Sequence, residues 1–81
     1  MNNHSEELPL TDMNAGEKGV ILKIKGDSIL RKRLLDMGLT RGALIEVIRR
    51  APLGDPIEFL IKNYHLTLRK KDGKQIIVRR I

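Results

Sequence analysis

The sequence predicts a mainly β fold, a small and strongly bent antiparallel barrel of about five strands with one short α-helix. Five short segments alternate apolar and polar residues, which is the pattern of half-buried strands. Only one segment repeats its apolar residues at the three- and four-residue spacing of a helix. A chain of 81 residues suffices for one domain with a small core, and so many short strands are typical of a barrel.

The N-terminal segment is expected to be a flexible tail over residues 1–7, because it is polar and acidic. The domain should then cover residues 8–81 and begin with a short turn, residues 8–13, that packs on the barrel. The sequence GVILKIKG follows and predicts the first strand. Its apolar residues, which should share the face toward the core, are Val20, Leu22 and Ile24, with Lys23 and Lys25 opposite.

The sequence DSILRKRLLDMG predicts the helix, about three turns long. Asp27 or Ser28 can accept a hydrogen bond from the free N–H groups of the first helical turn. Gly38 can adopt the left-handed conformation that ends a helix. The apolar stripe of this helix, which should pack on the core, consists of Leu30, Leu34 and Met37.

The other four alternating segments follow the helix in the sequences ALIEVIRRA, IEFLIK, HLTLRK and QIIVRRI. Asn63 tolerates positive φ and should turn the chain between the second and third of them. The sequence KKDGK before the last strand predicts a short turn or a single helical turn. The residues that should face the core are Ile45, Val47, Ile57, Phe59, Ile61, Leu66, Leu68, Ile76 and Val78.

The sequence APLGDP interrupts the strands at residues 51–56. Pro52 and Pro56 lack the N–H that strand pairing needs, and Gly54 and Asp55 favour turns between them. The segment is therefore predicted to be a rigid loop. Two interpretations remain open: a sharp corner of the barrel, or a preformed loop that is presented to a partner.

The charge is uneven along the chain. The net charge is +6 overall, with −2 in residues 1–30 and +8 in residues 31–81. Nucleic acid, an anionic membrane or an acidic partner protein could each match such a charge. Single-strand-binding barrels stack bases on aromatic side chains, and this chain has only Phe59 and Tyr64. We therefore expect no specific nucleic-acid binding.

Catalytic and metal-binding chemistry has little support in the sequence. The chain has no cysteine, and neither His4 nor His65 has a second ligand at a helical or strand spacing. No nucleophile with a neighbouring base and no phosphate-binding glycine loop is present. We expect neither enzymatic activity nor a cofactor. No secretory signal or bilayer-spanning apolar run is present either, which predicts a cytoplasmic protein.

From Leu8 to about residue 80 the sequence resembles the FeoA family, the ferrous iron transport protein A group. The resemblance rests on an ordered combination: an arginine and leucine pair, then MG, an apolar residue, a glycine, APxGDP, an LALR-like strand and a final IxV. The matching residues are Arg33, Leu34, Met37, Gly38, Leu39, Gly42, Ala51, Pro52, Gly54, Asp55, Pro56, Leu66, Leu68, Arg69, Ile76 and Val78. Met13, Asn63 and Thr67 depart from the usual pattern in tolerable ways.

The resemblance implies an SH3-like barrel that serves bacterial ferrous iron uptake by binding and regulating FeoB, a membrane transporter with a cytosolic G-protein domain. Such an interaction would recruit the protein to the inner face of the membrane. We hypothesise that the partner-binding residues are Leu39, Arg41, Arg49, Arg50, Pro52, Gly54, Asp55, Pro56 and Arg69. The alternative is a basic small-barrel domain that binds nucleic acid or belongs to a transcription regulator. Weak self-association through a free strand edge is also open.

Overall fold

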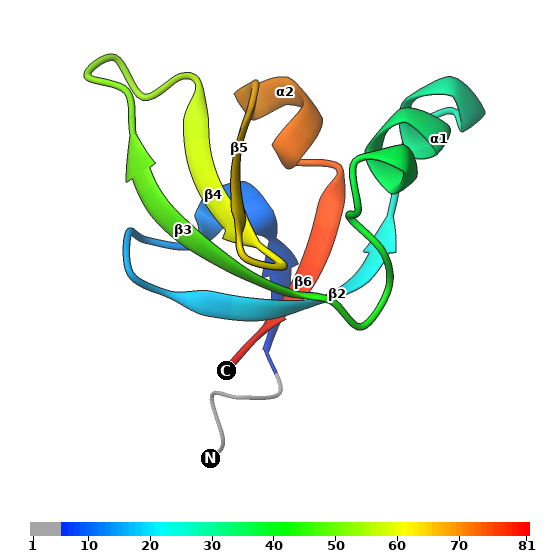
Figure 1. The fold of residues 1–81 in the computed structure, drawn as a ribbon, viewed down its shortest axis with the longest axis horizontal. Helices are drawn as coiled ribbons and strands as arrows, with labels where there is room; N and C mark the ends of the chain where they lie inside the picture. Colours follow the sequence, from blue (N-terminus) through cyan, green and yellow to red (C-terminus); the bar gives the residue numbers. More distant parts are fainter. Residues whose placement is uncertain (1–5) are drawn as a thin grey trace.

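The computed structural model describes residues 6–81, which form one curved antiparallel sheet with three short helical segments (Figure 1). The strand order is β1-β6-β2-β3-β4-β5. The strands are β1 (Glu7–Pro9), β2 (Lys18–Ile24), β3 (Leu44–Arg50), β4 (Ile57–Ile61), β5 (Tyr64–Leu68) and β6 (Ile76–Arg80). The helical segments are the 3₁₀ turn η2 (Leu10–Asp12), α1 (Ser28–Asp36) and the single turn α2 (Lys70–Gly73).

The mainly β prediction with one short helix is confirmed, but the strand count is six rather than five. The additional strand is β1, which pairs with β6 through Leu8 opposite Val78. Three residues that end in a proline are too short to show alternation, so only the pairing with β6 makes them a strand. The predicted tail is therefore too long by Glu7 at least, and residues 1–5 lie outside the described chain.

The prediction for β2 was wrong about which residues face the core. Ile21 is fully buried, whereas Val20 and Leu22 are only half-buried on the other face. The cause is a β-bulge: Ile21 pairs with Val78 and Lys23 with Ile77, so Leu22 is an extra residue without a partner. A bulge shifts the alternation of a strand by one residue, and beyond it Ile24 packs against the core as predicted.

Helix α1 begins and ends as predicted. The Asp27 side chain accepts a hydrogen bond from the Leu30 N–H at 2.8 Å, and Gly38 follows the helix with φ of +93°. Leu34 is fully buried, while Leu30 and Met37 are partly buried against the core. The predicted apolar stripe is therefore the face that α1 packs on the barrel.

Replacing Asp27 with alanine tests this cap. We expect a loss of about 1 kcal/mol of unfolding free energy, because the Leu30 N–H then has no side-chain acceptor. Asn keeps an acceptor oxygen, so Asp27→Asn should stay close to wild type. Urea unfolding followed by circular dichroism measures both variants, and equal losses in the two would contradict the capping role.

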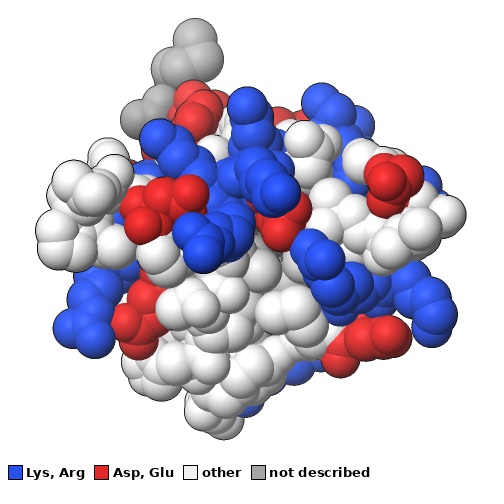
Figure 2. Space-filling view, turned by 90° about the horizontal axis from the view of Figure 1, so that it is seen from above, with Lys and Arg blue, Asp and Glu red and all other residues white. Residues whose placement is uncertain are grey.

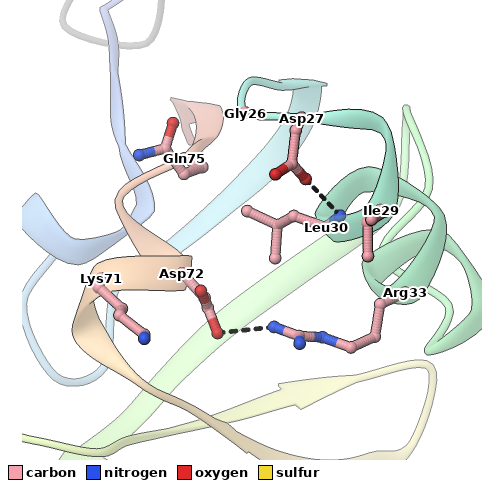
Figure 3. A pocket seen from close by; sticks show the side chains of 8 residues that line it. All are labelled: Gly26, Asp27, Ile29, Leu30, Arg33, Lys71, Asp72 and Gln75. Atoms are coloured by element: carbon pink, nitrogen blue, oxygen red, sulfur yellow. Dashed lines mark hydrogen bonds and ion pairs between the residues drawn. The ribbon is translucent and has the colours of Figure 1, made fainter.

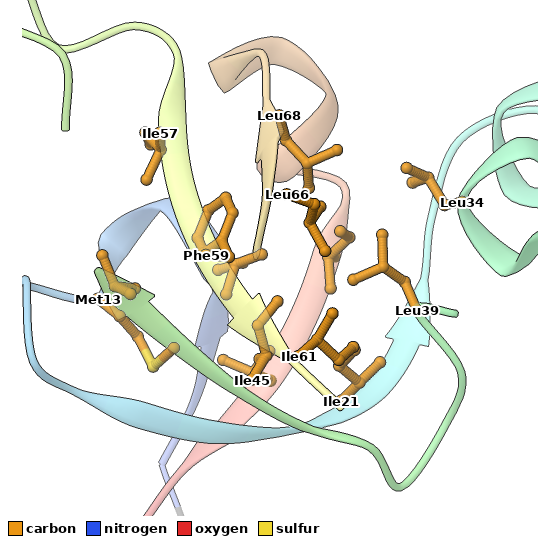
Figure 4. Close-up of a cluster of buried hydrophobic side chains, with 14 of the residues drawn as sticks. Met13, Ile21, Leu34, Leu39, Ile45, Ile57, Phe59, Ile61, Leu66 and Leu68 are labelled. Atoms are coloured by element: carbon orange, nitrogen blue, oxygen red, sulfur yellow. The ribbon is translucent and has the colours of Figure 1, made fainter. Parts of the chain in front are cut away.

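The core lies inside the curve of the sheet, where the side chains of β3, β4, β5 and β6 meet (Figure 4). Phe59 is fully buried among aliphatic side chains. Every inward residue predicted for these four strands is buried. Asn63 has φ of +69° in the β4–β5 turn, and KKDG forms the predicted single helical turn.

Candidate partner-binding surface

The loop of residues 51–56 joins β3 to β4 at a corner of the barrel (Figure 1). The Gly54 N–H donates to the Ala51 carbonyl at 2.7 Å, and the Ala51 N–H donates to the Pro56 carbonyl at 3.0 Å. Gly54 has φ of +88°, a conformation that side chains disfavour. With two prolines and these two hydrogen bonds, the loop has a defined shape.

Leu53 at the loop tip was not among the predicted site residues. It is 97% exposed, more than any other large apolar residue described. A leucine held in water by a shaped loop is an apolar group available to a partner. The loop sequence has no apolar alternation around Leu53, so the sequence alone could not show whether this leucine is exposed or packed on the core.

Asp55 ties the loop to α2. Its Oδ1 accepts a hydrogen bond from the Lys70 N–H at 2.9 Å, across a sequence separation of 15 residues. This contact sets the loop beside the bases of α2. Asp55 therefore positions the candidate surface, and its substitution would disturb α2 as well as the loop.

Arg50 has a different role from the one predicted. Its Nη2 donates to the carbonyl oxygens of Thr11 and Met13, each at 2.7 Å, and the residue is half-buried. These bonds hold the segment around η2 against the end of β3. Arg50 is thus mainly a structural clamp rather than a free basic side chain.

Arg49 lies on the exposed side of the same strand end and forms part of a chain of charges. Its Nε donates to Glu58 Oε1 at 2.8 Å, and Glu58 Oε2 lies 2.8 Å from His65 Nδ1. Desolvation would raise the pKa of the Glu58 carboxyl. The hydrogen bonds with His65 and Arg49, together with their charges, outweigh it and hold this pKa below its usual value.

This pKa shift predicts a pH dependence of stability. A carboxyl whose pKa is lower in the folded state contributes stability above its unfolded-state pKa, and that contribution disappears as pH falls through the folded-state pKa. We expect wild type to exceed Glu58→Gln in unfolding free energy at neutral pH. The difference should shrink as pH falls below about 4.5. Urea unfolding across this range measures it, and a constant difference would contradict the assignment.

Two open hollows flank the loop. One, of about 430 Å³, lies on the β3 side and is lined by Arg49, Arg50, Ala51, Pro52, Pro56, Glu58 and Thr67. The other, of about 490 Å³, lies on the α2 side and is lined by Thr11, Asp12, Asp55, Lys70, Lys71 and Lys74. The loop therefore stands between two depressions that a partner could fill on either side of Leu53.

The face that carries this loop, α2 and α1 is rich in bases. Figure 2 views the molecule from this side and shows Lys and Arg side chains gathered over its middle, with acidic side chains between them. Within residues 6–81, the bases on and next to α2 form no ion pair; they are Arg69, Lys70, Lys71 and Lys74. Free cations on one face attract an anionic partner and speed its encounter.

A third hollow, of about 450 Å³, separates α1 from α2 on this face (Figure 3). Arg33 Nη2 donates to Asp72 Oδ2 at 2.8 Å, and this bond joins the two helices across the hollow. Ile29, at its rim, is 77% exposed. The hollow extends the uneven, partly apolar surface from the loop across to α1.

The comparison with known proteins decides the family. A family model described as the FeoA domain matches residues 8–80. The chain belongs to the FeoA family. The FeoA resemblance noted in the sequence is thereby confirmed, and it covers nearly the whole chain.

A relative in Porphyromonas gingivalis is named as a fusion of Fe(2+) transport protein A with the Fe(2+) transporter FeoB. It is 38% identical over 69 residues, which are 85% of this chain and only 8% of the fusion protein. A crystal structure of an iron uptake regulatory protein, FeoA, matches with a TM-score of 0.85 at 33% identity. That match covers 94% of this chain and all of the other. The SH3-like barrel is confirmed by this agreement.

A manganese-dependent transcriptional repressor also matches, with a TM-score of 0.86 over 93% of this chain and 37% of the repressor. Its sequence identity is 17%, so the likeness shows the fold alone.

FeoA-family membership supports a role in ferrous iron transport, and the family is one of transport accessory domains rather than a known enzyme family.

The structure of this FeoA-family protein brings together most of the predicted site residues, but not all. Pro52, Gly54, Asp55, Pro56, Arg49, Arg50 and Arg69 lie in or around the loop and the start of α2. Leu39 is fully buried, because its N–H returns to the Leu34 carbonyl and its side chain enters the core, so it offers no surface to a partner. Arg41 lies in the α1–β3 connection, away from the loop (Figure 1).

Residues 6–81 contain no group of three or more His, Cys, Asp or Glu side chains placed to hold a metal ion. His4 lies outside the described residues. No helix in the described part of the chain has both the length and the apolarity to cross a bilayer.

Proposed function

We propose that this FeoA-family protein is an accessory protein of ferrous iron uptake that binds and regulates a FeoB-like membrane transporter. The observation that carries the proposal is the fusion relative, in which an FeoA region and a FeoB transporter share one polypeptide. Covalent linkage supplies a high effective concentration, and such linkage is useful only where the two parts can meet. We expect the FeoA domain of this chain to meet a FeoB-like transporter in the same way.

The proposed contact is the 51–56 loop with the bases beside it. Leu53 supplies an exposed apolar tip, and the loop needs little ordering on binding because its hydrogen bonds already fix its shape. Arg49 lines the hollow on one side of the loop, and Lys70, Lys71 and Lys74 line the hollow on the other side. Central apolar groups dominate binding energy in most interfaces, while charged rims mainly affect encounter rate.

The experiment is capture of the purified transporter, reconstituted in lipid nanodiscs, on the immobilised protein, with and without guanine nucleotide. Wild type should retain the transporter, and empty nanodiscs should not be retained. Failure to capture the transporter in every nucleotide state would overturn the proposal. A nucleic-acid-binding domain would give that negative result.

Leu53→Ser locates the contact on the loop. We expect affinity for the transporter to fall by about 10- to 150-fold, because an apolar side chain of this size contributes about 1.5–3 kcal/mol on burial. The matched control is Ile81→Ser, which removes an exposed apolar side chain, 52% exposed, near the chain terminus. Binding isotherms by interferometry measure both. An equal effect in both variants, or none in Leu53→Ser, would place the contact elsewhere.

A further inference from the structure

A separate groove lies between β2 and α1 and has a floor of apolar side chains. Its volume is about 260 Å³, and its lining residues are Ile21, Leu22, Lys23, Ile24, Arg31, Leu35 and Arg41. Leu35 on α1 is 48% exposed, and Leu22 and Ile24 on β2 are half-buried. Leu22 lies here because the β-bulge turns it away from the core.

The β2 side of this groove is a free strand edge. Pairing of β2 with β3 ends at Val20 opposite Leu44. Ile21, the next residue, still bonds to the segment just before β3. Its N–H donates to the Ala43 carbonyl at 2.9 Å, and its carbonyl accepts from the Gly42 N–H at 2.7 Å. From there to Ile24 the strand pairs only with β6. An unpaired edge can receive an extended chain through backbone hydrogen bonds.

The rim of the groove is positively charged. Lys23, Arg31 and Arg41 are all exposed, and within residues 6–81 their side chains form no ion pair or hydrogen bond. None of the lining residues is acidic. Three cations around an apolar floor, with no internal counter-charge, are complementary to a ligand that carries both carboxylates and apolar side chains.

We propose that this groove binds an extended segment of a partner protein in which apolar residues alternate with Asp or Glu. The apolar side chains would cover Leu22 and Leu35, the backbone would run beside residues 22–24 of β2, and the carboxylates would reach the three cations. A nucleic acid would use the cations but leave the apolar floor exposed. The groove shares no residue with the 51–56 loop, so the inference is independent of the transporter contact.

The first test uses a synthetic probe, a fluorescein-labelled peptide of alternating glutamate and leucine, against the same design with lysine in place of glutamate. Fluorescence anisotropy of the full-length chain should show binding of the acidic peptide with a Kd on the order of 10–100 μM. This affinity should fall with added salt. The basic peptide should bind at least about tenfold more weakly. Amide shifts in NMR spectra should be largest at residues 22–24 and at Leu35.

The second test uses variants at exposed positions. Arg31→Glu and Arg41→Glu should each weaken the acidic peptide by about tenfold, since each reverses a charge at the rim. Leu35→Ser should weaken it by a similar factor by removing part of the floor. Lys71→Glu on α2 makes the same change in net charge and should leave the affinity within about twofold. Circular dichroism checks that each variant is folded. If Arg31→Glu does not fold, Arg31→Gln, which only removes the charge, takes its place.

Several results would overturn the inference. Equal binding of the acidic and basic peptides, no binding, or an equal loss in Lys71→Glu would each do so. Binding to phosphatidylglycerol vesicles that depends on Arg31 and Arg41, without peptide binding, would make the groove a lipid site. Concentration-dependent dimerisation that Leu35→Ser abolishes would make it an interface between copies of this chain.

Discussion

Replacing Phe59 with alanine is expected to lower the free energy of unfolding by about 3–5 kcal/mol. Phe59 is fully buried on β4, with Val47 and Leu66 as its cross-strand partners. The other buried core side chains are aliphatic apart from Met13. Because the structure around a removed ring relaxes only partly, a cavity should remain. A domain of this size has about 5–15 kcal/mol of total stability, so a large fraction of the variant should unfold under mild denaturation.

Urea unfolding followed by far-ultraviolet circular dichroism measures this loss. Phe59→Leu is the matched control, because it keeps most of the apolar volume and should cost less than about 1.5 kcal/mol. A loss below 1 kcal/mol in the alanine variant would mean that the barrel collapses around the cavity. The sheet would then be less rigid than its packing indicates.

Replacing Arg50 with methionine is expected to cost about 2–4 kcal/mol, since it removes two hydrogen bonds from a charged donor to half-buried carbonyls. Methionine keeps the apolar part of the side chain and leaves the Thr11 and Met13 oxygens without this donor. The neighbouring Arg49→Met is the matched control. Its ion pair with Glu58 is exposed, with the Arg49 side chain 78% accessible, so the loss should stay below about 1 kcal/mol.

The same urea titrations compare the two arginine variants. Equal losses would contradict the assignment of Arg50 as the clamp on η2. The pair also separates stability from binding, because both residues were predicted as partner contacts. A loss of transporter binding in Arg49→Met with the fold intact would identify the exposed arginine as the contact.

The sequence was sufficient to predict the core of β3 through β6. Residues such as Ile45, Phe59 and Leu66 follow strict alternation, and alternation is a local property that the chain displays without its partners. The same reasoning failed in β2 because one extra residue, Leu22, reverses the pattern partway along. A bulge depends on the pairing with β6, which no local pattern contains.

The candidate site could be predicted only in part, for a related reason. The turn chemistry of Pro52, Gly54 and Pro56 is local and indicated the loop correctly. The clamp formed by Arg50 and the contact of Asp55 with α2 join residues far apart in sequence, so they were not predictable. Burial of Leu39 likewise depends on how α1 docks on the barrel.

The APxGDP pattern acquires a physical meaning from these contacts. Gly54 provides the positive φ, Asp55 holds α2, and the prolines end the strands. The one position that the pattern leaves open is Leu53, the exposed tip. The fixed positions therefore build the loop, and the open position is the one free to determine which partner surface it fits.

Both ends of the described chain lie together, because the Arg80 N–H donates to the Glu6 carbonyl at 3.3 Å. In Figure 1 they lie at the end of the barrel opposite the 51–56 loop and α2. A tether joined to either terminus would thus leave the loop face pointing outward. This geometry lets the domain be anchored to a support, or to a longer polypeptide, without hiding the side that we expect to meet the transporter.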